Sequence, residues 1–103
     1  MPQLPHSLDY IRQVLAEYFA DKPGQRVQVF GSYARGEATA ESDLDVLLSR
    51  DPTAKLTLFD LVDYQEDLQQ RLGLKVDLGT EIDPYIQRYV RKDLTTAYEK
   101  AAA

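Results

Sequence analysis

The chain has 103 residues, of which 44% are hydrophobic and 28% charged, a composition typical of one small folded domain. Its 12 Lys and Arg residues against 17 Asp and Glu residues give a formal net charge of -5, which argues against a general nucleic-acid binder because neutralising phosphates needs a basic surface. The chain contains no cysteine, so disulfides, thiolate metal sites and a cysteine nucleophile are excluded.

The first half of the chain predicts one helix and two short strands. Apolar residues recur at helical spacing over residues 8–20, with Ser7 as a suitable N-cap and residues 21–24 as a stop. Residues 27–30 and 44–48 are rich in β-branched and apolar side chains, and each segment predicts a strand.

A second helix is predicted over residues 58–72, where Thr57 can cap the start and Gly73 can end it. Its inward face is predicted to carry Leu58, Leu61, Val62, Gln65, Leu68 and Leu72.

The remaining residues predict a third strand and a last helix. The strand spans residues 75–78, and the helix opens with Asp83 as cap and Pro84 at the first helical position. That helix is predicted to turn Ile86, Tyr89, Val90, Leu94, Ala97 and Tyr98 inward. We therefore expect an α/β (α+β) domain with a small mixed β-sheet flanked by helices. No apolar run reaches the roughly 20 residues that cross a bilayer and the start lacks the order of a secretion signal, so we expect a cytoplasmic domain.

A glycine and a serine directly follow the first predicted strand. Gly31 lets the backbone turn sharply and approach a ligand closely, because no Cβ intervenes. If residues 32–35 begin a short helix, its free N–H groups favour a phosphate, the Ser32 hydroxyl adds a donor and Arg35 adds positive charge. Taken alone, Gly31-Ser32 is also compatible with an ordinary turn, and Arg35 with a surface ion pair to a nearby glutamate.

Two aspartates follow at the second predicted strand. Asp43 and Asp45 lie two residues apart, and residues two apart on a strand face the same side, about 7 Å from each other. The two carboxylates repel, and a divalent cation relieves that repulsion. Mg²⁺ takes hard oxygen ligands, usually one or two carboxylates with phosphate oxygens and water. Taken alone, the pair is equally compatible with a solvated strand edge.

A third aspartate lies within the strand predicted at residues 75–78. Val76 and Leu78 face inward there, so Asp77 faces the other side. If this strand pairs beside the one that carries Asp45, three carboxylates line one cleft opposite the Gly31-Ser32 turn. Alone, Asp77 is also compatible with a surface strand residue.

Gly31-Ser32, ten intervening residues, Asp43-x-Asp45 and a later strand aspartate, Asp77, together resemble the signature of DNA-polymerase-beta-type nucleotidyltransferases. The short chain resembles their smallest branch, the minimal nucleotidyltransferase (MNT, MntA-type) proteins. We therefore expect residues 1–100 to form a single MNT domain and residues 101–103 to be a cloning remnant. The resemblance implies a nucleotidyltransferase-type fold, ATP as substrate and two Mg²⁺ ions as cofactors.

The resemblance also implies a role for each site residue. Gly31, Ser32 and Arg35 would bind the nucleotide, whereas Asp43, Asp45 and Asp77 would be catalytic and would bind metal. Members of the MNT branch act as antitoxins of HEPN-domain ribonuclease toxins, and some transfer AMP from ATP to a tyrosine of the toxin. The implied partners are thus a HEPN toxin, in a hetero-oligomer, and a nucleoside triphosphate, with no direct nucleic acid and no membrane.

Two alternatives stay open at this point. An antitoxin of this branch can neutralise its toxin by binding alone, without catalysis. Transfer to a small molecule, as aminoglycoside nucleotidyltransferases perform it, is the second alternative, although the short chain leaves no second domain to hold such an acceptor. An acceptor that brings its own binding surface, namely a folded protein, fits the size of the chain better.

Overall fold

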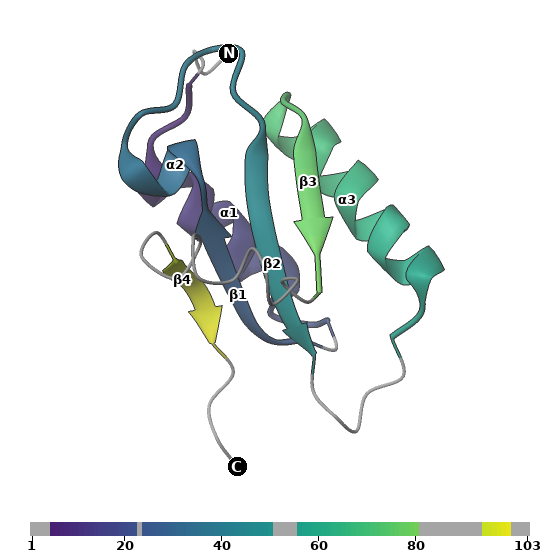
Figure 1. Ribbon diagram of the computed structural model, residues 1–103. Coiled ribbons are helices and arrows are strands. Elements are labelled where there is room, and N and C mark those ends of the chain that lie inside the picture. Colours follow the sequence, from purple (N-terminus) through teal and green to yellow (C-terminus); the bar gives the residue numbers. More distant parts are fainter. Residues whose placement is uncertain (1–4, 23, 51–55, 81–93, 100–103) are drawn as a thin grey trace, which may run out of the picture.

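The structure is a computed structural model that describes residues 5–22, 24–50, 56–80 and 94–99. A four-stranded sheet has the order β3-β2-β1-β4 (Figure 1). Strand β2 runs antiparallel to β1 and parallel to β3, whereas β4 runs antiparallel to β1, so the sheet is mixed as the sequence predicts. In chain order, the described helices and strands are α1 (Leu8–Phe19), β1 (Gly24–Phe30), α2 (Ser32–Arg35), β2 (Leu44–Arg50), α3 (Leu58–Leu72), β3 (Val76–Gly79) and β4 (Thr95–Glu99).

The core lies between one face of the sheet and the helices α1 and α3. Alternation along each strand turns one set of apolar side chains toward the helices and the intervening side chains toward the opposite face. The largest fully buried side chains belong to α1, β1, β2, α3 and β3: Ile11, Leu15, Phe19, Val27, Val29, Leu44, Val46, Leu48, Leu68 and Val76. Because Leu44 and Val46 face this core, the residue between them must face the other way.

The helix boundaries follow their capping residues. The Ser7 hydroxyl accepts a hydrogen bond from the backbone N–H of Tyr10 at 3.1 Å, which confirms the predicted start of α1. Thr57 and Asp60 form a reciprocal capping box at the start of α3. Gly73 ends that helix with φ +68° and donates its N–H to the Gln69 carbonyl at 2.8 Å.

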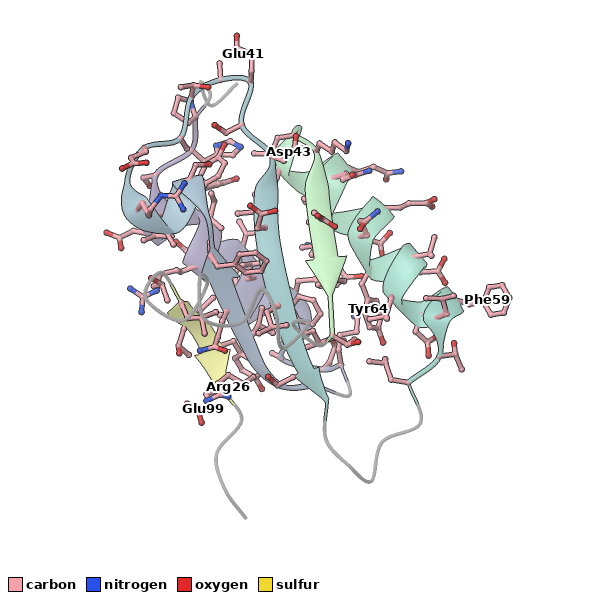
Figure 2. The ribbon with its side chains drawn as sticks, viewed as in Figure 1. Arg26, Glu41, Asp43, Phe59, Tyr64 and Glu99 are labelled. Carbon is pink, nitrogen blue, oxygen red and sulfur yellow. The ribbon has the colours of Figure 1, made fainter. Side chains whose placement is uncertain are left out.

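The inward face predicted for α3 is wrong over its first turns. Leu58 is 75% exposed and Val62 47% exposed, and Phe59 beside them extends into solvent (Figure 2). The reason is one of length, because a 15-residue helix spans about 22 Å and the four-residue strand β3 about 13 Å. The helix therefore begins beyond the end of the strand that it covers.

The end of the chain corrects a second prediction. Leu94, Ala97 and Tyr98 do not continue a helix, because residues 95–99 form β4, which pairs with β1. The first part of the predicted last helix, from Asp83 to residue 93, lies outside the described residues. Two consecutive threonines and Tyr98 favour an extended backbone, and the open side of β1 supplies the hydrogen-bonding partner.

Candidate active site

A sharp bend joins β1 to α2. Gly31 has φ +76° and ψ -152°, a conformation open to glycine and strained for other residues. A Cβ placed on Gly31 would overlap Oδ2 of Asp45. The short helix α2 that follows confirms the predicted strand-to-helix turn, and its first N–H groups have no acceptor within the helix.

The helix α2 is held to the domain by its second residue. Tyr33 is 3% exposed and packs into the core, and the backbone of His6 hydrogen-bonds its hydroxyl. Burial raises the pKa of Tyr33 above its ordinary value. The Ser32 backbone therefore stays next to the bend, with its carbonyl accepting a bond from Glu37 N–H at 2.9 Å.

The strand register brings two of the predicted acids side by side. Asp45 of β2 and Asp77 of β3 are direct partners in the parallel pair. The neighbours of each face the core, so both carboxylates lie on the opposite face of the sheet. Asp45 is also the partner of Phe30 in β1, the residue just before the bend. The condition set for Asp77, that its strand lie beside the strand of Asp45, is met.

Asp43 lies just outside β2 and not within it. The strand begins at Leu44, and Asp43 is exposed at its start, where Figure 2 labels it. Its charge still acts on Asp45. Burial raises the pKa of Asp45, and the carboxylates of Asp77 and Asp43 raise it further, whereas the Arg35 guanidinium lowers it. Two neighbouring negative charges therefore act on the half-buried carboxyl group of Asp45.

The donor set fits a hard divalent cation in its chemistry, because three carboxylates supply oxygen ligands and Asp45 bears a repulsion that a cation would relieve. As the side chains stand, however, no group of three His, Cys, Asp or Glu residues within the described ranges is placed to hold a metal ion.

Arg35 lies at the end of α2 and pairs with an acid. Its Nε donates to Glu37 Oε2 at 3.1 Å, and both side chains are largely exposed. This is the surface ion pair that the sequence left open beside a phosphate-binding role. Its positive charge nevertheless reaches Asp45, whose pKa it lowers.

Two glutamines of α3 were missed as contributors to this region. Gln69 and Gln65 accept hydrogen bonds from the backbone N–H groups of Val76 and Leu78, the residues on either side of Asp77. The signal was present, because Gln65 stands on the face of α3 that the sequence predicts to be inward. A glutamine on an inward helix face indicates a polar group that needs a partner.

Comparison with known proteins identifies the family. The model described as "Nucleotidyltransferase domain" matches residues 8–99. The chain belongs to this family. The candidate protein adenylyltransferase MJ0128 of Methanocaldococcus jannaschii is 40% identical over 87 residues, which are 81% of this chain and 83% of the relative. The protein adenylyltransferase MntA of Thermococcus cleftensis is 43% identical over 54 residues, 52% of each chain.

Solved structures share the fold. A candidate minimal nucleotidyltransferase gives a TM-score of 0.72 at 31% identity, over 89% of this chain and 97% of the other. A toxin–antitoxin complex with AMP-PNP gives 0.69 at 17% identity, over 87% and 73%. A complex of the tri-AMPylated Shewanella oneidensis HEPN toxin with its MNT antitoxin gives 0.62 at 16% identity, over 90% and 71%. Each of the two complexes resembles this chain in fold alone, because its sequence identity is below 25%. The family match confirms the nucleotidyltransferase assignment.

Within the described parts of this nucleotidyltransferase, none of the helices is both long enough and apolar enough to traverse a bilayer.

Proposed function

We propose that this nucleotidyltransferase is a protein adenylyltransferase antitoxin, which transfers AMP from ATP to a tyrosine hydroxyl of a HEPN-domain ribonuclease toxin. The observation that carries the proposal is the pairing of Asp45 with Asp77 directly beside the Gly31 bend. The relatives named protein adenylyltransferase and the AMPylated HEPN toxin of a structural neighbour support the choice of acceptor. ATP and the ribonuclease target would meet the enzyme in the cytoplasm.

The nucleotide is assigned to the bend and to α2. Backbone N–H groups at Gly31 and Ser32 would bind the β- and γ-phosphates, with the Ser32 hydroxyl as a further donor. Arg35 would add positive charge one helical turn later, after exchanging its bond to Glu37 for one to phosphate. Because the chain carries a formal net charge of -5, such local donors and not an overall positive field must hold ATP.

The three acids are assigned to metal binding and proton transfer. Asp43, Asp45 and Asp77 would hold two Mg²⁺ ions, which supply charge neutralisation on the triphosphate and lower the pKa of the acceptor hydroxyl. In the transfer, the acceptor oxygen forms a bond to the α-phosphorus, the bond between the α-phosphorus and the bridging oxygen breaks, and pyrophosphate leaves. The exposed Asp77 carboxylate would take the proton of the acceptor hydroxyl.

The test is the mass of the toxin. A HEPN-domain protein from the same genome, as the proposed toxin, is incubated with the enzyme, ATP and Mg²⁺, and intact-mass spectrometry follows both proteins. We expect added mass in multiples of one AMP residue on the toxin, located on a tyrosine by peptide fragmentation. Asp45→Asn serves as the inactive control.

Other results lead to different conclusions. No added mass, with the ribonuclease still inhibited by a stable complex, would leave neutralisation by binding alone. AMP on a small hydroxylated acceptor, with none on the toxin, would indicate a small-molecule nucleotidyltransferase.

A further inference from the structure

The third acid stands on the outermost strand of the sheet. Strand β3 has four residues, and among the described residues it pairs with β2 on one side only. The Lys75 carbonyl accepts a hydrogen bond from Leu44 N–H at 2.9 Å, so the odd-numbered backbone groups face β2. Because alternate residues of a strand direct their backbone groups to opposite edges, Val76 and Leu78 direct theirs away from β2. These outer groups would otherwise be solvated or unpaired.

Two glutamine side chains of α3 occupy this outer edge. Val76 N–H donates to Gln69 Oε1 at 3.1 Å and Leu78 N–H donates to Gln65 Oε1 at 3.0 Å, both in part-buried surroundings. The spacing of the donors matches that of the acceptors. Residues four apart on a helix are separated by about 6.0 Å along its axis, and residues two apart on a strand by about 6.6 Å.

We infer that Gln65 and Gln69 are positioning residues of the nucleotidyl-transfer site, which fix β3 and thereby hold Asp77 opposite Asp45. This inference rests on the metal and proton-transfer role proposed for Asp77. Their side-chain hydrogen bonds go to the backbone on each side of Asp77, so the glutamines would act on this acid through the strand that carries it. With β2 bonded along one edge and α3 along the other, the short strand cannot slide or tilt without breaking a part-buried hydrogen bond.

The inference separates the two halves of the site. The bend at Gly31 belongs to β1 and α2, whereas the two glutamines of α3 bond the backbone of β3 on each side of Asp77. Loosening β3 should therefore disturb the chemical step and the metal requirement more than the binding of ATP. A purely structural role would lower stability without this separation.

The variants remove or keep the side-chain oxygen that accepts each hydrogen bond from β3. Gln65→Met and Gln69→Met, singly and together, keep side-chain length and helix propensity but replace the amide oxygen by a weak acceptor. Gln65→Glu and Gln69→Glu, each made singly, keep an acceptor oxygen. Gln70→Met, on an exposed position of the same helix, is the matched control. Circular dichroism and thermal unfolding establish that each variant folds, and the single variants retain one of the two bonds.

Amide hydrogen exchange by NMR is the first readout. We expect faster exchange at Leu78 in Gln65→Met and at Val76 in Gln69→Met, with no change in Gln70→Met. The second readout is AMP transfer at varied ATP and Mg²⁺. In the double Met variant we expect kcat to fall about tenfold to a hundredfold while KM for ATP changes less than about twofold, because a small misplacement of a reacting group carries a cost of this size. The Glu variants should stay within about threefold of the parent in kcat.

Metal binding is the third readout and requires no turnover. Mn²⁺ is titrated into labelled protein, and the broadening of the Asp45 and Asp77 amide signals is followed. We expect the double Met variant to need several-fold more Mn²⁺ than the parent or Gln70→Met.

Each contrary result is distinct. Unchanged hydrogen exchange at the Val76 and Leu78 amides would show that the glutamines do not fix β3. Faster exchange at these amides, with kcat and Mn²⁺ binding at the level of Gln70→Met, would overturn the positioning role. If the parent transfers no AMP to any acceptor but the double variant still binds Mn²⁺ more weakly, the proposed function falls and the positioning role stands.

Discussion

The carboxylate of Asp45 lies against the α-carbon of Gly31, so closely that a methyl group on this glycine would overlap Oδ2. The glycine also has φ +76°, which other residues rarely adopt. Two independent constraints thus require glycine here, one from the backbone and one from the acid across the strand. They tie the bend that we assign to phosphate binding to the acid that we assign to metal binding.

Gly31→Ala should therefore lose AMP transfer as well as stability. The added methyl group must displace the Asp45 carboxylate, and a displacement of about 1 Å in a reacting group costs on the order of a hundredfold in rate. Gly36→Ala is the matched control, because Gly36 has φ +74° with nothing within 4 Å of an added Cβ. Gly36→Ala should lose about 1–2 kcal/mol of unfolding free energy from its left-handed backbone, measured by denaturant titration, and Gly31→Ala should lose at least as much. Equal rates in the two variants would contradict the link between Gly31 and Asp45.

Asp45→Asn should abolish transfer and stabilise the fold at neutral pH. The pKa of Asp45 is raised in the folded protein, so its contribution to stability is fully present below about pH 3.9, the ordinary carboxyl value, and is lost as pH rises through the raised pKa. Relief of like charge between neighbouring strands predicts a melting temperature about 1–5 °C higher than the parent at pH 7. Thermal unfolding without divalent ions should show this gain vanish near pH 3. A lower melting temperature at pH 7 would speak against the repulsion.

Arg35 and Glu37 allow the two interpretations of Arg35 to be separated. If Arg35 binds phosphate, Arg35→Gln should raise KM for ATP about tenfold, while kcat changes little. Glu37→Gln removes the negative charge of the carboxylate 3.1 Å from Arg35 Nε and should leave KM equal or lower. Because the ion pair is largely exposed, neither substitution should change the unfolding free energy by more than about 0.5 kcal/mol. An unchanged KM in Arg35→Gln would contradict the phosphate-binding role of Arg35.

Tyr18 connects α1 to α3, and its ionisation should contribute to the loss of stability at alkaline pH. Its hydroxyl donates to Asp67 Oδ2 at 2.7 Å, and burial followed by that bond raises the pKa of Tyr18 above its ordinary value. The stability that Tyr18 contributes is therefore fully present below about pH 10 and lost as pH rises further. Tyr18→Phe should cost about 1 kcal/mol at pH 7 and unfold less steeply above pH 10, as followed by circular dichroism. The same alkaline profile in both proteins would refute this assignment.

Most of the fold could be predicted from local pattern. Apolar periodicity and capping residues fixed α1 and α3 in sequence, and alternation revealed the strands that carry Asp45 and Asp77. The strand at residues 95–99 could not be predicted in this way. Its identity depends on the open side of β1, a tertiary partner that overrides the local helical spacing. Likewise, the exposure of Leu58 follows from the short length of β3 and not from the residues of α3.

The candidate site was predictable in its residues and less so in its connections. Same-face spacing predicted that Asp45 and Asp77 would converge if their strands paired, and the register confirms the pairing. The contact of Asp45 with Gly31 needed the antiparallel pairing of β1 with β2, which spacing alone does not give. The partners of Gln65 and Gln69 are backbone groups distant in sequence, so no local pattern could name them.

The glutamine pair has a consequence for the behaviour of many copies of this protein in a crowded solution. An edge strand with unpaired backbone groups can pair with the same strand of a neighbouring molecule and start an aggregate of stacked strands. Each backbone N–H that donates a hydrogen bond to Gln65 or Gln69 is unavailable to a strand of another molecule. The two side chains thereby help to keep an acidic, cysteine-free protein of 103 residues from polymerising along the strand that bears Asp77.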